Sequence, residues 1–418
     1  MSDIHHITNS FALYLHIPFC EGKCRYCDFY SVNYGSTQMT EYLECLKKEM
    51  LIYSSLINNE YTSIETIYIG GGTPGLLNTE QVSNILELIK KNFGKPSTGE
   101  ITLEANPFSL TEEKISGYRK AGVNRISLGV QSFNNKELKF LGRKHSAEEA
   151  IKKVNMVRDY YDNFNIDLIF AIPGQAVEDW RYTLEKAVYL NPNHISLYNL
   201  QIEEDTPLAT ALSKGDFEEV DDSIDARMYI LAREVLEGNG YNQYEISNFA
   251  REGYQSRHNR VYWELKPYLG LGPAAHGFTG SIRYNNYNDV YKYQETLSKV
   301  PDEIRSDKSG GSYTGLIGQG IHQGMDALTS QVLPIENIIE LSKEDLMAER
   351  LFMGLRLLEG ISLDDFFTEY GIRVEEYYAD EIRKLRSREL IYLGEGRLKL
   401  TEKGLLFGNS VFMEFLPA

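Results

Sequence analysis

The stretch LYLHIPFCEGKCRYCDFYS, residues 13–31, brings three cysteines close together directly after a short apolar segment. The apolar segment is predicted to be a β-strand, and Cys20, Cys24 and Cys27 then fall on the loop that leaves it. Only four cysteines occur in 418 residues, so this clustering does not suit a disulfide framework and does suit metal ligation. The pattern therefore predicts a metal centre at the end of the first strand.

Two kinds of metal centre and one structural arrangement fit three closely spaced thiols. Iron–sulfur clusters are usually held by four thiolates, so three cysteines leave one iron open to a substrate or cofactor. A zinc site needs a fourth ligand, such as His16, and zinc ligands are usually spaced as two separate pairs. Three structural thiols without a metal are the third alternative. The spacing favours the cluster, and Cys45, in a helical pattern, is expected to be a buried and inert thiol.

Short apolar runs alternate with amphipathic stretches over the first half of the chain. The runs are rich in β-branched residues and nearly continuous, which is typical of parallel strands covered on both faces. Helical patterns such as residues 111–122, which end at Gly122, lie between them. Six such units predict an α/β fold, a partial (β/α)6 TIM-like barrel whose functional loops follow the strands. The predicted strands are residues 13–17, 66–70, 101–105, 125–130, 165–172 and 194–200.

The remainder of the chain changes character twice. A segment rich in Tyr, Asn, Gly and His has no clear period, and a Gly/Ser-rich segment follows it. An amphipathic helix, further helices and a hairpin around Glu395–Gly396 then predict a small winged-helix-like α+β domain. The predicted parts are an N-terminal tail (1–10), the barrel (11–235), a barrel extension (236–300), an insertion or linker (301–335) and the C-terminal domain (336–418).

Composition restricts the function. The 43 Lys and Arg residues stand against 60 Asp and Glu, a net charge of −17 that disfavours general binding to nucleic acid. No run of about 18 apolar residues occurs, so no integral membrane segment is expected. The first residues also lack the pattern of a secretory signal, and a cytoplasmic location is predicted.

The run from Tyr14 to Cys20, the cysteine spacing and the tyrosine before Cys27 resemble the radical S-adenosylmethionine (SAM) superfamily. In that superfamily three cysteines hold a 4Fe-4S cluster, and the open iron chelates the amino and carboxylate groups of SAM. An electron from the cluster then cleaves SAM to methionine and a 5′-deoxyadenosyl radical. The resemblance therefore implies that Cys20, Cys24 and Cys27 hold a 4Fe-4S cluster beside a SAM site.

The second predicted strand ends in GGGTP, residues 70–74, where glycines let the backbone approach a ligand closely. A tight turn is the alternative, but the run resembles the methionine-binding loop of the superfamily. Carboxylates or amides at strand ends can bond ribose hydroxyls, and Arg143 can pair with the carboxylate of SAM. The SAM-binding residues that the resemblance implies are Tyr14, Gly71, Gly72, Thr73, Glu104, Gln131, Arg143 and Asp167.

Two further features resemble one group of the superfamily, which includes oxygen-independent coproporphyrinogen III oxidase and the heme chaperone HemW. The oxidase has a fourth cysteine two positions after the third, where this chain has Phe29. The run HNRVYW, residues 258–263, resembles the heme-associated motif of the chaperone branch. Imidazole is a common ligand of heme iron, so His258 is a candidate axial ligand, with a loop-orienting role as the alternative. His276 is a candidate second heme contact or a structural residue, and His322 is assigned no role.

Three functions follow from these patterns. The resemblance favours a heme chaperone, with heme, acceptor hemoproteins and an electron donor such as flavodoxin or ferredoxin as partners. Coproporphyrinogen III dehydrogenase, which decarboxylates two propionates through substrate radicals, is the main alternative. A radical SAM enzyme that modifies nucleic acid is disfavoured by the acidic composition.

Overall fold

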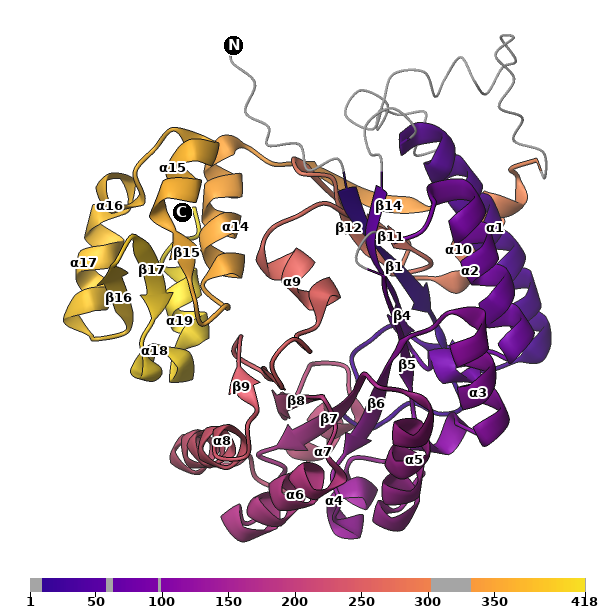
Figure 1. The fold of residues 1–418 in the computed structure, drawn as a ribbon, viewed down its shortest axis with the longest axis horizontal. Coiled ribbons are helices and arrows are strands. Elements are labelled where there is room, and N and C mark those ends of the chain that lie inside the picture. The colour runs from indigo at the N-terminus through magenta and orange to yellow at the C-terminus, as the bar shows by residue number, and fades with distance from the viewer. Residues whose placement is uncertain (1–9, 58–62, 97–98, 302–331, 418) are drawn as a thin grey trace.

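One twelve-stranded sheet organises the computed structural model, which describes residues 10–57, 63–96, 99–301 and 332–417 (Figure 1). Its centre consists of six parallel strands in chain order, which confirms the predicted α/β fold and all six predicted strands. These strands are β1 (Ser10–Ile17), β4 (Ser63–Gly71), β5 (Glu100–Ala105), β6 (Arg125–Gln131), β7 (Phe164–Phe170) and β8 (His194–Asn199).

Helices between the strands cover the outer face of this sheet (Figure 1). The predicted helix over residues 111–122 is α3, which begins after Thr111, whose hydroxyl accepts the N–H of Lys114. It ends at Gly122 in a left-handed conformation, with φ of 115°, as the Gly signal predicts. The helices of this layer are α1 (Ser36–Ile57), α2 (Thr79–Phe93), α3 (Glu112–Ala121), α4 (Asn135–Phe140), α5 (Ala147–Tyr160), α6 (Val177–Leu190), α7 (Pro207–Ser213) and α8 (Asp222–Glu237).

The two faces of the parallel strands differ in polarity. Alternate residues such as Ile67, Leu103 and Ile126 are buried in the apolar core beneath the helices. The residues between them point to the opposite, inner face and include Thr102, Arg125 and many other polar side chains that are buried. The inner face is therefore a polar surface whose strand ends carry the candidate SAM residues.

The barrel extension, joined by one strand from beyond the predicted linker, continues the sheet at both edges, although the sequence shows no strand period in the extension. At one edge β11 (Tyr268–Leu271) pairs parallel with β1, and three antiparallel strands follow it. At the other edge β10 pairs antiparallel with β8, and β9 pairs antiparallel with β10. The added elements are β9 (Asn242–Gln243), β10 (Asn248–Ala250), α9 (Arg257–Trp263), β12 (His276–Phe278), β13 (Ile282–Asn286), α10 (Val290–Ser298) and β14 (Ile335–Glu340).

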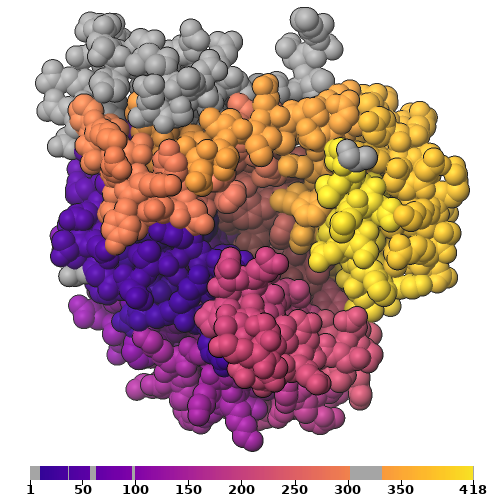
Figure 2. All heavy atoms as spheres, turned by 180° about the vertical axis from the view of Figure 1, so that it is seen from behind, coloured from indigo at the N-terminus to yellow at the C-terminus, as the bar shows by residue number. Residues whose placement is uncertain are grey.

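The C-terminal domain has its own apolar core and a three-stranded sheet. The predicted hairpin is confirmed, because Glu395 and Gly396 both have positive φ, 55° and 71°, as a tight hairpin turn requires. Figure 1 shows this domain beside α9, across from the barrel, and Figure 2 shows the surface hollowed between them. Its elements are α14 (Lys343–Gly354), β15 (Ile361–Ser362), α15 (Leu363–Tyr370), α16 (Val374–Tyr377), α17 (Ala379–Ser387), β16 (Ile391–Gly394), β17 (Arg397–Leu400), α18 (Glu402–Leu406) and α19 (Gly408–Met413).

Two predicted segments fall outside the described residues. Nearly all of the N-terminal tail, residues 1–9, and most of the predicted linker, residues 302–331 with His322, are among them. Within the part of the chain that the structure does describe, none of the helices combines the length and apolarity that a bilayer crossing requires.

A buried carboxylate, Glu49, joins α1 to the added strands. It accepts hydrogen bonds from the Gly272 N–H at 2.8 Å, the Asn286 side-chain amide at 2.6 Å and the Tyr293 hydroxyl at 2.6 Å. Burial raises its pKa from the ordinary value of 4.5 to about 7, against the lowering effect of these donors. Three groups from separate segments thus depend on one side chain that is fully buried.

We expect Glu49→Ala to lower the free energy of unfolding by roughly 3 kcal/mol or more near pH 5, because three buried donors lose their acceptor. The folded pKa lies above the unfolded one, so this stabilisation is complete at low pH and declines as pH rises through about 7. Denaturant unfolding of both proteins from about pH 5 to pH 8 measures this shrinking difference. Glu44→Ala, an exposed site on the same helix, is the control and should change stability by less than about 0.5 kcal/mol.

Candidate functional site

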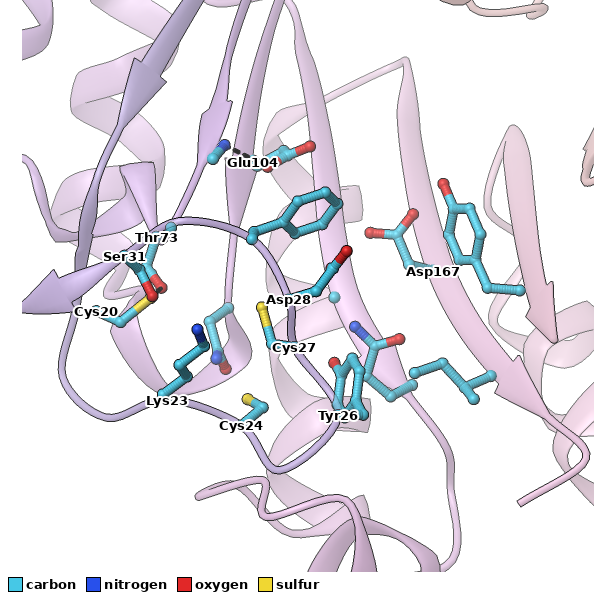
Figure 3. A pocket seen from close by; sticks show the side chains of 18 of the residues that line it. Cys20, Lys23, Cys24, Tyr26, Cys27, Asp28, Ser31, Thr73, Glu104 and Asp167 are labelled. Carbon is cyan, nitrogen blue, oxygen red and sulfur yellow. Dashed lines mark hydrogen bonds between the residues drawn. The ribbon is translucent and has the colours of Figure 1, made fainter. Parts of the chain in front are cut away.

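The carboxyl ends of the parallel strands and the cysteine loop together line a cavity of about 360 Å³ (Figure 3). In Figure 3 the labelled cysteines lie on this loop, with Glu104 and Asp167 on the strands behind it. The sequence-predicted residues that line the cavity are Cys20, Cys24, Cys27, Gly71, Gly72, Thr73, Glu104, Gln131, Arg143 and Asp167. Lining residues that the sequence prediction missed include Tyr68, Ser127, Tyr198 and Gln201.

The cysteine loop is held by backbone contacts on three sides. Its two ends pair as the short strands β2 (Phe19–Cys20) and β3 (Val32–Asn33). In its middle the Arg25 N–H donates to the Leu141 carbonyl at 3.1 Å, and the Leu208 N–H donates to the Arg25 carbonyl at 3.0 Å. The loop is therefore fixed between the segments that follow β6 and β8.

Each of the three thiols has a different environment. The Sγ of Cys20 lies 3.4 Å from the Thr73 hydroxyl, and the Arg143 guanidinium donates to the Sγ of Cys24 at 3.3 Å. Burial raises the pKa of Cys27 to about 11. A cationic donor beside one thiol is the kind of contact that stabilises a thiolate ligand.

The structure bears on the zinc alternative left open by the sequence. Among the residues that the structure describes, no group of three or more His, Cys, Asp or Glu side chains is placed to hold one metal ion. A zinc ion needs every thiolate about 2.3 Å from the same atom. The thiolates of a 4Fe-4S cluster bind separate irons and lie farther apart. The described side chains therefore form no ready-made site for a single zinc ion, and the cluster on the three cysteines stays a prediction.

The glycine run after β4 brings two loops into close contact. The N–H groups of Gly72 and Thr73 donate to the carbonyls of Ile17 and Phe19, each at 2.8 Å. A Cβ on Gly72 would lie only 2.7 Å from the Phe19 carbonyl oxygen, so no larger residue fits there. These two N–H groups are therefore used within the protein, whereas we expected this loop to offer its backbone to a ligand.

Gly71 is restricted for a different reason. Its φ of 109° lies in the left-handed region, and a Cβ at this position would lie 2.8 Å from the His16 ring. Its N–H donates to Glu104 Oε2 at 3.2 Å, the contact drawn dashed in Figure 3. The glycine thus connects the loop to the carboxylate at the end of β5.

Two half-buried carboxylates stand at the strand ends. Burial raises the pKa of Glu104 to about 7, and Glu104 Oε1 accepts the Tyr68 hydroxyl at 2.6 Å. Burial also raises the pKa of Asp167, which accepts the Asn165 side-chain amide at 2.7 Å. Both carboxylates face the cavity, where their oxygens can accept hydrogen bonds from ligand hydroxyls.

Two polar residues, one at the end of β6 and one in the segment that follows it, retain buried atoms without partners among the described residues. Gln131 adopts φ of 69°, and its Oε1 has no hydrogen-bond partner among the described residues. Arg143 donates from Nη2 to the Gly129 carbonyl at 2.7 Å, while its Nε is likewise unpaired within the described part of the chain. Buried polar atoms normally have partners, so these atoms fit a cavity that receives a polar ligand.

Two predicted site residues lie elsewhere. Tyr14 was expected in the SAM site, but its side chain lines a second cavity, and its hydroxyl lies 3.1 Å from His16 Nδ1. His258 is fully buried, with Nδ1 2.7 Å from the Thr66 hydroxyl and Nε2 2.8 Å from the Tyr262 hydroxyl. Because both ring nitrogens are engaged, this arrangement leaves none for heme iron. It fits the alternative, in which His258 orients its segment.

The second cavity, of about 630 Å³, meets the first at the cysteine loop. Asp28 and Phe29 of that loop line both cavities. The rest of its lining comes from β1, the segment around α9, the added strands and α14. His276 and Tyr262 are among these residues, so the region that carries the HNRVYW run borders this cavity.

Comparisons with known proteins agree with this architecture. The family described as the radical SAM superfamily matches residues 14–187, and the HemN C-terminal domain matches residues 341–407. The heme chaperone HemW of Lactococcus lactis is 34% identical over 404 residues, covering 96% of both chains. HemW of Bacillus subtilis is 32% identical over 406 residues, covering 96% of this chain and 98% of its own. The coproporphyrinogen III oxidase (HemN) structure from Escherichia coli covers 98% of this chain and 91% of its own, with a TM-score of 0.77 at 21% identity, a likeness of fold.

The domain match and the cysteine loop make this chain a member of the radical SAM superfamily. Its relatives also include the zebrafish mitochondrial radical S-adenosyl methionine domain-containing protein 1, 33% identical over 97% of this chain and 86% of that protein. Within the superfamily, the chain belongs to the HemW family, whose bacterial members it matches along nearly its whole length.

We expect Cys24→Ala to abolish the iron–sulfur cluster, because only two of the three proposed thiolate ligands then remain. Anaerobically reconstituted wild-type protein should carry about four irons per chain, measured by iron content and visible absorption. Cys45→Ala is the matched control, since Cys45 is buried in α1 and its Sγ contacts the Gln294 carbonyl at 3.9 Å. Equal loss of iron in both variants would show that the three-cysteine assignment is wrong.

We also expect Gln131→Met to weaken SAM binding about tenfold, because this cavity-lining residue loses its unpaired Oε1 while its side-chain length is kept. Equilibrium binding of SAM to the reconstituted protein measures the effect. Iron content and unfolding midpoint should stay at the wild-type values. Unchanged SAM affinity would mean that Gln131 does not contact the ligand.

Proposed function

We propose that this protein is a heme chaperone, which binds heme and transfers it to acceptor hemoproteins on a scaffold that holds a 4Fe-4S cluster and SAM. The observation that carries the proposal is similarity over 96% of the chain to proteins named heme chaperone HemW. The proposal places the protein in the cytoplasm, where thiols remain reduced. It also includes an electron donor such as flavodoxin or ferredoxin.

Cys20, Cys24 and Cys27 are the proposed cluster ligands, and the fourth iron is left for SAM. When bound, the cluster supplies the electron that cleaves SAM in this superfamily. Side chains and backbone contacts of the protein itself hold the cysteines in position. Arg143 places positive charge 3.3 Å from one thiol, and the anchored loop keeps the three cysteines facing the cavity.

The SAM side of the proposal rests on the polar groups at the strand ends. Glu104 and Asp167 present acceptors for hydroxyl groups, and the unpaired oxygen of Gln131 accepts one further donor. Burial in the cavity strengthens such hydrogen bonds, because little water competes for them. These groups support binding and orientation of SAM whether or not SAM is cleaved.

The second candidate function is oxidative decarboxylation of coproporphyrinogen III. Phe29 stands where the oxidase resembled by this chain has its fourth cysteine, and its ring is 63% exposed. A phenyl ring offers no metal ligand, and hydrogen abstraction from a propionate requires reacting atoms about 3–3.5 Å apart in a site shaped for it. The residue at this position therefore supports the chaperone over the oxidase.

We expect the reconstituted wild-type protein to retain heme through gel filtration and to pass it to an apo-hemoprotein such as apomyoglobin. With SAM, a reductant and coproporphyrinogen III, we expect no protoporphyrinogen above background. Soret absorption follows the heme, and fluorescence after oxidation follows the porphyrin products. Catalytic formation of protoporphyrinogen, or failure to retain heme, would contradict the proposed function.

Phe29→Cys is the control for the oxidase alternative. The variant restores only the missing thiol, and the remainder of the cavity is unchanged. We expect it to remain without oxidase activity.

A further inference from the structure

The second cavity contains a histidine that is arranged differently from every other histidine of the described chain. His276 lies on β12 with its side chain exposed, and no hydrogen bond involves its ring among the described residues. The other described histidines, His16, His145, His194 and His258, are all buried and hydrogen-bonded. His276 therefore offers an available imidazole inside a cavity.

The backbone around this imidazole is fixed. His276 pairs with Asn285 of β13, and the Asn286 N–H donates to the Ala275 carbonyl at 2.9 Å. On the other side β11 approaches so closely that a Cβ on Gly270 would lie 1.9 Å from the His276 carbonyl oxygen. A fixed backbone limits the positions that the imidazole can reach, as a ligating residue requires.

The walls of the cavity are mainly aromatic. Tyr262, Trp263 and Tyr268 line it, and the Tyr262 and Tyr268 rings meet edge to face with centroids 4.7 Å apart. Phe29, which is 63% exposed, stands in the same cavity. Such surfaces pack well against a flat, largely apolar ligand, and about 630 Å³ lies in the range of cofactor pockets.

The lining also contains one thioether, Met353 of α14, and Met is a recognised partner of His in heme ligation. His16 is a poor alternative, because its Nδ1 contacts the Tyr14 hydroxyl and its Nε2 the Tyr30 carbonyl. Both desolvation and the nearby Arg283 lower the pKa of His276. The imidazole is therefore kept in the neutral form that ligates iron.

We infer that this second cavity is the heme site and that His276 ligates the heme iron. The inference rests on the proposed heme-chaperone function and deepens it, because it moves the ligand from the HNRVYW run to β12. The motif residues Tyr262 and Trp263 then form a wall of the site. His258 holds that wall in place through its contact with the Tyr262 hydroxyl at 2.8 Å.

The charges of the lining residues suit a heme group that is bound and later released. The charged groups among the described lining residues are the acidic Asp28 and Glu336. Lysine and arginine are absent from this described lining, so the heme propionates gain no ion pair there and would point to the open mouth. Iron ligation and ring packing, rather than salt bridges, would then hold the heme.

The test is hemin titration of wild-type protein and of His276→Ala, followed by Soret absorption. We expect His276→Ala to shift the Soret band and weaken hemin binding at least tenfold. Added imidazole should restore the wild-type spectrum in His276→Ala, because it replaces the lost ligand. Metal-free protoporphyrin should bind both proteins equally, since it makes no iron bond. Matching unfolding midpoints would show that the variant folds.

Two further variants separate iron ligation by His276 from ring packing and from ligation by His258. Phe29→Ala should weaken both hemin and metal-free protoporphyrin, because it removes ring packing and no ligand. His258→Ala should keep the wild-type Soret position at saturating hemin. The inference is overturned if His276→Ala binds hemin like the wild type, or if His258→Ala alone loses the ligated spectrum. If the wild-type protein itself retains no heme, the proposed function fails, and that outcome is distinct from failure of the His276 assignment.

Discussion

The close contact between the cysteine loop and the glycine run is the constraint on which the candidate site depends. The N–H groups of Gly72 and Thr73 donate to the carbonyls of Ile17 and Phe19. Gly72 has no Cβ, which leaves room for this approach. The contact places the Thr73 hydroxyl 3.4 Å from Cys20 and Gly71 within hydrogen-bonding distance of Glu104. Loop, strand end and carboxylate are thereby brought to one cavity.

The inner face of the sheet explains how so polar a site is stable. Arg125 is 2% exposed and lies among Glu104, Asp167 and His194, so its charge acts on all three. It opposes the burial that raises the pKa of the two carboxyls, and it lowers the pKa of the histidine. Asn165 connects Asp167 to His194. Its side-chain amide donates a hydrogen bond to Asp167 at 2.7 Å, and its side-chain oxygen lies 2.7 Å from His194 Nδ1.

Much of this arrangement could be predicted from sequence, and the parts that could not have physical causes. The six central strands were predictable because each carries buried aliphatic residues such as Ile67 and Leu103. The polar residues between them, such as Ser127, also repeat with period two, a signal that would have found the missed lining residues. The short strands β9 and β12 were not predictable, because two or three residues are too few for a period and only their pairing makes them strands.

The placement of Tyr14 and His258 could not be predicted from their motifs. The Tyr14 ring stacks on Tyr68, which lines the first cavity, with centroids 6.2 Å apart, and a motif does not say which of two neighbouring cavities a side chain on that face reaches. It also does not say which groups the ring nitrogens of a histidine contact. The HNRVYW run begins α9, whose first N–H groups donate to Glu100, and this fixes His258 against Thr66 on the inner face. The same helix turns Tyr262 and Trp263 toward the second cavity. One short motif thus has a buried end that fixes the helix and an aromatic end that borders a cavity. A free imidazole for that cavity must then come from another strand, and within the described chain β12 supplies it.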